Sequence, residues 1–476
     1  MASISSPGLG SGLDVNSIVS KLVAVESQPL QILQKKATAI NTDISAYGQI
    51  KSNLSDLQTA VQALTDGTLW LGKAFTSSNS AVSGTASASA PTGTFAVQVS
   101  TLATAQTTAS TAITAGSAIG AGGRLDIQLG SWSGTSFTAG SSSVASISVA
   151  STDTMASIAA KINAANAGVS ATVISGASGD QLTLISTATG IANGFQIRSY
   201  DGSSTEITDG TTGVGKLAYN TSAGTSYGMT RTQTAIDTTG TLNGISISSS
   251  NLTIANAVSG LTLTVNATTS TPAQVVVSSD TASMKSKLQS FVDTYNKVNS
   301  SLRTLTKYDA ATKTGGPLQG DGLITGLQTM LRNLIGTIGP SGTGFTRLSD
   351  MGIQIQRDGS LQISDTKLSS ALGNTTNVRN FLTAAATGSS PAGVMGQLNS
   401  FLTTALGTTG AIATGTTGLQ KSLDSNQKSM DSLNAHIAAY QKQITSQFNA
   451  LDTKMSSLTS LSSFVSQQIT QWNKSG

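Results

Sequence analysis

Apolar residues recur at alternating steps of three and four near both ends of the chain, the spacing that puts side chains on one face of an α-helix. This spacing predicts long amphipathic helices over residues 13–66 and 419–472. Such a stripe must be buried against a partner helix, either in an antiparallel pair within one domain or in a bundle between chains. The second stripe comprises Leu419, Leu423, Asn426, Met430, Leu433, Ile437, Tyr440, Ile444, Phe448, Leu451, Met455, Leu458, Leu461, Val465, Ile469 and Trp472.

Local signals divide the N-terminal helical region in two. Asp14 stands where a helix N-cap is expected, before the first apolar-periodic residues. Pro29 cannot continue a helix from the preceding turn without losing a hydrogen bond. We therefore expect a break there, a second helix from about Leu30 to Asp66, and a stop at Gly67.

The middle of the chain changes from helical spacing to the alternation of half-buried strands. Phe95, Val97 and Val99 alternate with polar residues, and Asn243-Gly244 is the dipeptide of a tight hairpin turn. Residues 124–190 predict a β-α-β-β unit whose helix begins at residues 152–154. A Thr/Ala/Gly-rich stretch precedes this unit and predicts no element.

Helical spacing returns at Asp280 and is followed by a second helical pattern over residues 323–335 and a small hairpin over residues 352–363. The β-rich residues 73–277 are therefore inserted between helical segments, so the helical base must use both ends of the chain. We predict a multidomain α+β fold, with a long helical coiled-coil base built from both termini and inserted β-rich domains.

The amino-acid composition limits the classes of function that the chain can have. Only 10% of the 476 residues are charged and no cysteine is present, far from the ~25% charged residues of ordinary soluble domains. Hydroxyl and amide side chains take their place, as in many extracellular proteins. The dispersed basic residues do not form the clustered face that nucleic-acid binding needs. No cleavable signal peptide or membrane-spanning stretch is expected.

Residues with catalytic chemistry are few. His436 is the only histidine, and we expect it to be solvated on a helix flank rather than part of a triad or metal site. Residues 8–12 lack the strand and spacing of a dinucleotide loop and read as a flexible leader. Residues 364–367 and 313–315 match two elements of penicillin-interacting serine enzymes, but in the wrong order and without the third element. The sequence predicts no catalytic residues, no cofactor and no metal.

Several short motifs, taken in order along the chain, resemble the bacterial flagellar filament cap proteins, the hook-associated protein 2 family. Residues 144–186 resemble the small motif that flagellins share with related axial proteins. The resemblance covers both termini and patches between them. The other matching motifs are GSGLDVNSIV at residues 10–19, SAYGQIK at 45–51, FVDTYN at 291–296, GPLQGD at 316–321, LSDMGI at 348–353, RDGSL at 357–361 and FNALD at 448–452.

The resemblance implies a non-enzymatic protein that is exported by the flagellar type III apparatus and acts outside the cell at the flagellar tip. It implies a homo-oligomeric, ring-like cap that helps flagellin fold and insert. Further partners implied are the hook-filament junction proteins and an export chaperone, with host mucin or glycans as a possible ligand. Another axial subunit (a flagellin or junction protein) and a secreted adhesin are the alternatives.

The expected division places filament-facing helical segments at residues 1–42 and 441–476 and a helical base at 43–72 and 278–440. Residues 73–115 and 236–277 form one β-rich domain, and 116–235 an outer one. No nucleic-acid partner or membrane insertion is expected. The predicted subunit or filament interface comprises apolar residues of the two ends: Val15, Ile18, Val19, Leu22, Ile444, Phe448, Leu451, Leu458 and Val465.

Overall fold

The computed structural model describes residues 14–220, 227–388 and 390–473. These residues form two compact units, one built from the chain up to Leu69 and from Ala282 onward, the other from residues 70–281. The fold is mixed α and β, as the sequence predicts. Residues 8–12, read as a flexible leader, lie outside the described residues.

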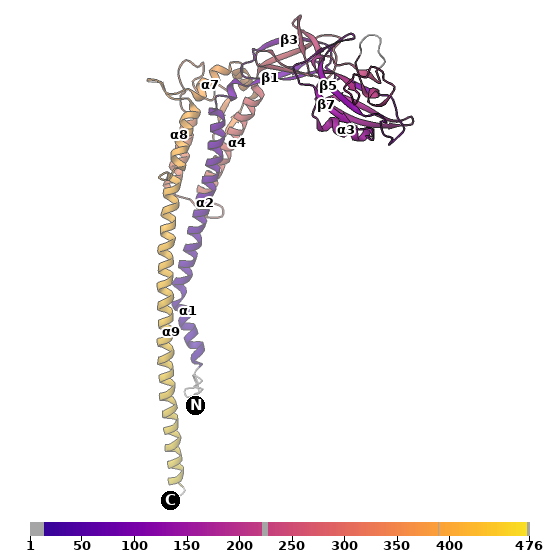
Figure 1. The fold of residues 1–476 in the computed structure, drawn as a ribbon. Helices are drawn as coiled ribbons and strands as arrows, with labels where there is room; N and C mark the ends of the chain where they lie inside the picture. The colour runs from indigo at the N-terminus through magenta and orange to yellow at the C-terminus, as the bar shows by residue number, and fades with distance from the viewer. Residues whose placement is uncertain (1–13, 221–226, 389, 474–476) are drawn as a thin grey trace. The chain divides into compact units, whose positions relative to one another are not determined.

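The first unit is helical, and its helices come from both ends of the chain (Figure 1). Two short hairpins lie between them, β17 (Tyr308–Asp309) with β18 (Thr314–Gly315) and β19 (Ile353–Ile355) with β20 (Leu361–Ile363). The helices are α1 (Val15–Glu26), α2 (Gln28–Thr65), α4 (Thr281–Thr306), α5 (Gly322–Ile335), α6 (Asp365–Leu372), α7 (Thr375–Thr383), α8 (Val394–Leu406) and α9 (Ala411–Trp472).

The ends of α1 and α2 follow the predicted local signals. The Asp14 carboxylate accepts a hydrogen bond from the Ser17 backbone N–H at 3.0 Å and so caps α1. The chain breaks at Ser27, and Pro29 occupies the first turn of α2, where its missing N–H is not needed. The helix stops at Thr65, one residue before the predicted Asp66.

Helices α2 and α9 run antiparallel along one another (Figure 1). Their contacts show the direction, because residue numbers fall on α9 as they rise on α2. The Asn426 Nδ2 group donates to the Leu33 carbonyl at 2.9 Å, and further along α2 the Tyr47 ring lies against Gly415. The apolar stripe of α2 is thus paired within the chain, which is the antiparallel alternative that the sequence left open.

Tyr47 joins three helices of this unit. Its side chain is 1% exposed, and a Cβ added to Gly415 of α9 would lie 2.4 Å from its ring. Its hydroxyl donates to Asp321 Oδ2 at 2.5 Å, while Asp321 Oδ1 accepts from the backbone N–H groups of Leu323 and Ile324 at the start of α5. One aromatic side chain therefore fixes α2 against both α5 and α9.

The second unit is β-rich and has two hydrophobic cores. A five-stranded sheet, β1-β16-β3-β12-β13, and a three-stranded sheet, β14-β15-β2, share one core. The strands of this part are β1 (Lys73–Ser77), β2 (Val82–Ala86), β3 (Gly93–Thr101), β12 (Thr238–Leu242), β13 (Ile245–Ser249), β14 (Thr253–Val258), β15 (Leu261–Val265) and β16 (Ala273–Ser279).

The other core lies among two four-stranded sheets and a short helix. One sheet has the order β10-β5-β6, with β7 also paired to β5, and the other is β11-β4-β9-β8. The elements are β4 (Thr107–Ser110), β5 (Gly123–Ser133), β6 (Ser136–Ala139), β7 (Ala145–Val149), α3 (Met155–Ala164), β8 (Val169–Gly176), β9 (Gly179–Ser186), β10 (Gly194–Tyr200) and β11 (Met229–Gln233).

The predicted β-α-β-β order is confirmed by β7, α3, β8 and β9. Thr154 caps α3 through the Ser157 N–H at 3.3 Å. The pairing is less simple than the order, because β7 joins β5 whereas β8 and β9 pair in the other sheet. The Asn243-Gly244 turn between β12 and β13 is also confirmed, with φ values of 49° and 80° that suit a type I′ hairpin.

Some elements were not predicted. Strand β4 lies in the Thr/Ala/Gly-rich stretch, which has no large apolar residue in this strand, and it is held by pairing with β9 and β11. Helices α7 and α8 were also missed, although Phe381 and Leu398 are fully buried in them. Ser364 stands at the N-cap of α6 as predicted, but its side chain makes no capping hydrogen bond.

We expect Gly415→Ala to destabilise the helical unit. The new Cβ would lie 2.4 Å from the Tyr47 ring, and overpacking of this kind costs about 1–3 kcal/mol. The control is Gly418→Ala in the same helix, where a Cβ meets nothing within 4 Å and helix propensity should add about 0.5–1 kcal/mol. Urea unfolding of both variants measures the difference, and equal effects would contradict the tight Tyr47–Gly415 contact.

We expect Asp43→Asn to stabilise the helical unit at neutral pH. Burial, and then the Asp321 carboxylate, raise the pKa of Asp43 above its usual 3.8. Because the folded-state pKa is raised, the protonated wild-type side chain is most favourable to folding stability below pH 3.8. This contribution to stability is lost as the pH rises through the folded-state pKa. The gain in stability from Asn should be about 0.2–0.5 kcal/mol at pH 7, the scale of like-charge pairs on a helix surface.

Thermal unfolding of Asp43→Asn at pH 7 and below pH 3.8 checks this sign. The gain should shrink toward zero in the acidic measurement. Asp424→Asn, at an exposed carboxylate of α9, controls for loss of charge alone. A gain that persists at low pH would rule out repulsion as its cause.

Candidate functional site

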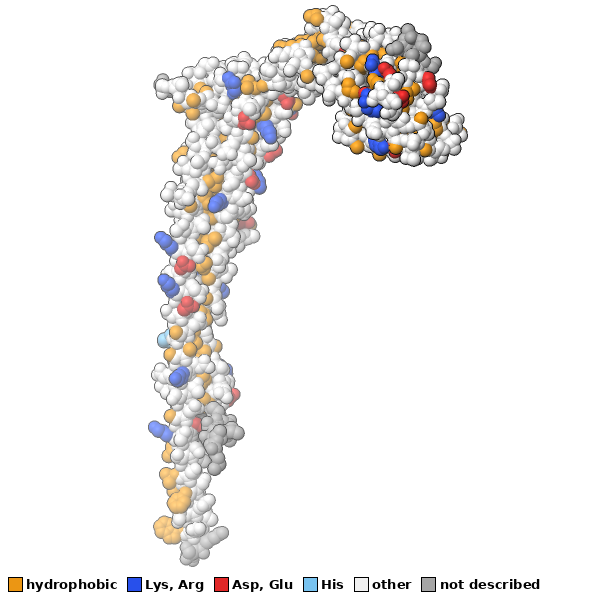
Figure 2. All heavy atoms as spheres, viewed as in Figure 1, with side chains coloured by type: hydrophobic (Ala, Val, Ile, Leu, Met, Phe, Trp, Pro, Cys, Tyr) orange, Lys and Arg blue, Asp and Glu red, His pale blue; other side chains and the backbone are white. Residues whose placement is uncertain are grey.

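The C-terminal part of α9 presents a row of exposed apolar side chains, which we call the distal stripe. Leu458 is 58% exposed and Ile469 is 52% exposed. Steps of three and four place these side chains on one face of the helix. Figure 2 shows hydrophobic side chains gathered over this end of α9. The distal stripe comprises Leu451, Met455, Leu458, Leu461, Val465 and Ile469.

The N-terminal interface residues have a different environment. Val15 is 2% exposed and Val19 is 7% exposed, on the side of α1 that contacts α9. Ile18 is half-buried, and Leu22 is 37% exposed. The structure therefore buries two of the predicted interface residues inside the chain and leaves Leu22 on the surface.

The pairing of α1 with α9 accounts for the burial of the next two predicted residues. His436 Nδ1 lies 3.5 Å from Glu26 Oε1. Both helices rise about 1.5 Å per residue, so the antiparallel register brings Val15 level with residues 444–448. Ile444 and Phe448 are accordingly half-buried. The other predicted residues, Leu451, Leu458 and Val465, lie beyond this level and are exposed.

Met455, Leu461 and Ile469 belong to the same surface, although they were left out of the predicted interface. The helical period in the sequence already includes them, so the signal was present. Asp452 and Lys454 are the only charged residues between positions 446 and 472. The surface therefore presents apolar side chains and hydroxyl groups and few charges.

The histidine and the two motifs that were considered for enzyme chemistry lie in or beside ordinary helices and strands. His436 is exposed on the flank of α9 and pairs with Glu26, as expected for a solvated histidine. Thr314 and Gly315 form β18, and Ser364 precedes α6. Within residues 14–220, 227–388 and 390–473, no group of three or more acidic, histidine or cysteine side chains could hold a metal ion. No described helix is long and apolar enough to cross a membrane.

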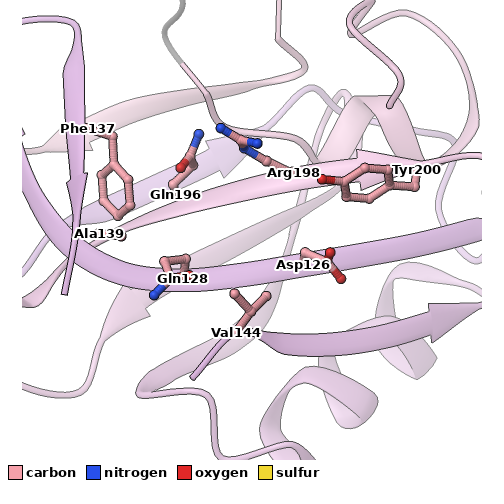
Figure 3. A pocket seen from close by; sticks show the side chains of 8 residues that line it. All are labelled: Asp126, Gln128, Phe137, Ala139, Val144, Gln196, Arg198 and Tyr200. Carbon is pink, nitrogen blue, oxygen red and sulfur yellow. The ribbon is translucent and has the colours of Figure 1, made fainter. Parts of the chain in front are cut away.

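The β-rich unit contributes a second candidate surface, a hollow of about 300 Å³ on the sheet formed by β10, β5 and β6. Figure 3 shows the side chains that line it. The β10 residue Gln196 is 6% exposed and lines the hollow. Phe137 and Val144 provide apolar walls. The hollow thus places an amide side chain beside an aromatic ring.

The charged groups at this hollow are already neutralised. Asp126 lies 3.0 Å from the guanidinium of Arg124, which stacks 4.5 Å over the Tyr200 ring. Asp126 also accepts a hydrogen bond from Ser146 at 2.7 Å. Arg198 lies 3.9 Å from Glu206. An uncharged polar ligand fits this arrangement better than an ion does, because no charge is left without a counter-charge.

Family models match most of the chain. The model described as flagellar hook-associated protein 2 N-terminus covers residues 11–106, and the C-terminus model covers residues 235–460. The flagellin hook IN motif matches residues 136–188. This last match overlaps the β-α-β-β unit, which the sequence had related to flagellins.

Known proteins are similar over nearly the full length. The flagellar hook-associated protein 2 of Escherichia coli K12 is 31% identical over 479 residues, which cover 98% of each chain. The A-type flagellar hook-associated protein 2 of Pseudomonas aeruginosa is 28% identical and covers 97% of this chain, with 96% of its own length matched.

A solved structure supports the same assignment. The crystal structure of the D1-D2-D3 domains of the flagellar cap protein FliD from Escherichia coli matches with a TM-score of 0.59 and 29% identity. The match covers 79% of this chain and 99% of that one. The chain belongs to the flagellar hook-associated protein 2 family, whose members are flagellar cap proteins.

Proposed function

We propose that this chain assembles with copies of itself into a ring-like cap at the tip of the flagellar filament. There it promotes the folding and insertion of exported flagellin subunits. The observation that carries the proposal is the distal stripe, an apolar helix face that no described part of the chain covers. Its partner would be a helix of flagellin or of a neighbouring cap subunit.

The energetics favour a partner for this surface. Burying one side chain of the size of Leu contributes about 1.5–3 kcal/mol, and the distal stripe offers several in one row. Most helical stability in proteins comes from packing of an apolar face rather than from helix propensity, so residues 451–469 would gain both burial and helical stability when a partner helix covers them. Contact with an apolar partner would therefore be coupled to ordering of this segment.

The proposal also assigns roles to the parts of the chain. Residues 1–42 and 441–476 would face the filament, and residues 43–72 with 278–440 would form the base that carries them. The β-rich residues 73–277 would form the outer part of the cap. Export by the type III route with a chaperone, and contact with the hook-filament junction proteins, are inferred from family membership.

We expect Leu458→Asp to weaken cap assembly, because it places a charge in the middle of the distal stripe. The matched control is Ser460→Asp, which puts the same charge on the opposite face of α9. Loss of one buried leucine should cost about 1.5–3 kcal/mol per subunit contact, or more than tenfold in affinity. Electron microscopy and flagellin sedimentation with the purified full chain measure assembly directly.

The same variants test the role in cells. In a strain lacking the natural cap gene, Ser460→Asp should restore filaments and motility, whereas Leu458→Asp should restore them poorly. Equal complementation by both variants would argue against the distal stripe as the filament contact. Labelling of the whole filament rather than its tip would favour the alternative of another axial subunit.

We infer a second candidate function, adhesion through the β-rich unit, from the hollow on its outer sheet. Neutral sugars bind through amides and through an aromatic wall, and both are present at Gln196 and Phe137. A hollow of about 300 Å³ is at the lower end of ligand-site volumes, which suits one or two sugar residues. Host mucin carries glycans of this kind.

We expect Gln196→Leu to reduce binding of the full chain to neutral glycans on an array or to mucin-coated surfaces. Removing a buried hydrogen-bonding amide from a polar ligand costs about 0.5–1.5 kcal/mol, or roughly threefold to tenfold in affinity. Gln233→Ala, at an exposed glutamine of β11, is the control. Absence of glycan binding by the wild-type chain would end this candidate.

A further inference from the structure

A polar side chain is buried where α9 packs along α1 and α2, a contact that we call the seam. Among the described residues of α9, only Ile412 in the first turn and Asn426 are buried. Asn426 is 4% exposed, whereas the neighbouring stripe residues Leu423 and Met430 are only half-buried. Beyond the first turn of α9, the buried side chain among its described residues is therefore an amide, although leucine would bury more favourably there.

The amide makes one specific contact with the partner helix. Asn426 Nδ2 donates to the Leu33 carbonyl of α2 at 2.9 Å and lies 3.7 Å from Met430 Sδ. Asn426 Oδ1 is buried without a hydrogen-bond partner. The group is therefore only half satisfied, so it does not contribute the stability that an apolar side chain would contribute at this position.

The sequence of α2 explains why the contact forms at Leu33. In an α-helix the carbonyl of one residue points toward the residue four positions later, which is Ala37 for Leu33. Ala37 is the small member of a stripe that otherwise consists of larger residues. A short side chain at this position is compatible with the approach of Asn426 to the Leu33 carbonyl. The residue four positions after Ile40 is the larger Ile44.

We propose that Asn426 is a positioning residue that sets the register of the α2–α9 seam. In the observed register its amide meets an accessible carbonyl. In a register slipped by one heptad, leucine and isoleucine would still face apolar residues, but Asn426 would lose its hydrogen bond while remaining buried. Buried asparagines select one register of a coiled coil in this way, at a cost in stability.

Few other contacts along this part of the seam distinguish one register from another. The Tyr47–Gly415 contact also selects this register at the start of α9, so a slip at Asn426 requires that contact to break or α9 to deform in the three turns between Gly415 and Asn426. Among the ion pairs of the described residues, one joins α9 to α1 or α2, between the exposed side chains of His436 and Glu26. Exposed pairs of this kind contribute little, so the buried amide is the stronger selector.

The register has a consequence for the distal stripe. A slip of seven residues moves one helix along the other by about 10 Å. It would change by that distance how far the stripe extends beyond Val15 and the end of α1. Asn426 therefore sets the length of exposed helix offered to a partner. The importance of this length for cap assembly rests on the proposed function, whereas the register itself can be tested without it.

Cross-linking of introduced cysteines measures the register directly, because the chain has no cysteine of its own. In the full chain, Glu26→Cys is combined with His436→Cys to report the observed register. Combining it instead with Ser429→Cys or Gln443→Cys reports a slip of one heptad in either direction. Each pair is treated with a short thiol–thiol cross-linker in three backgrounds: the natural Asn426, Asn426→Leu and Asn426→Ala.

With Asn426 present, we expect only the 26–436 pair to cross-link efficiently. In the Asn426→Leu background, cross-linking of a slipped pair should rise about tenfold, which corresponds to ~1.4 kcal/mol of register preference. The melting temperature should rise at the same time. Leu423→Ala is the control for a purely structural seam residue, and it should lower the melting temperature without any slipped cross-link.

The slipped cross-links decide the outcome. Their appearance in either Asn426 variant supports the proposal, and Asn426→Ala decides it if Asn426→Leu does not fold. Cross-linking of the 26–436 pair alone in both variants would overturn it. A slipped register with normal filament assembly would support the register role but count against the proposed function of the distal stripe.

Discussion

The antiparallel pairing of α2 with α9 is the constraint on which the rest of the helical unit depends. It joins segments that are nearly 400 residues apart in sequence, as the Asn426–Leu33 hydrogen bond shows. Tyr47 makes this pairing specific, because its ring requires a glycine opposite it and its hydroxyl binds the residue that caps α5. A long β-rich insertion is possible because the two helices form one seam regardless of the chain between them.

The same seam explains where the distal stripe begins. Helix α1 covers α9 as far as the level of Val15, and the apolar period of α9 continues past that level. The part of α9 beyond this level is the surface that we propose for contact with another chain, and membership of a family of flagellar cap proteins supports that proposal.

The buried cores of this molecule differ in chemistry from its exposed candidate surfaces. The helical base and the β cores are closed by apolar side chains such as Leu54, Phe291 and Phe195, each with essentially no exposure. The distal stripe is poor in charge, with Asp452 and Lys454 as the charged residues between positions 446 and 472. Under the proposed function, selectivity at the distal stripe would come from helix register and shape rather than from charge.

The long helices, the hairpin at Asn243-Gly244 and the order of β7, α3, β8 and β9 could be predicted from the sequence alone, because local spacing and turn chemistry encode them. The family could be predicted as well, because short motifs along the chain carry it. The sequence did not reveal β4, which has no large apolar residues and is held by strands distant in sequence. Helix α8 was also missed, although its buried residues Val394, Leu398 and Leu402 recur every four positions. The sequence also left open whether the terminal stripes pair within one chain or between chains. Only the tertiary structure decided that Val15 and Val19 are core residues while Leu458 is exposed, because all three share the same helical period. The length of the facing helix, and not the pattern itself, determines which part of a stripe is buried.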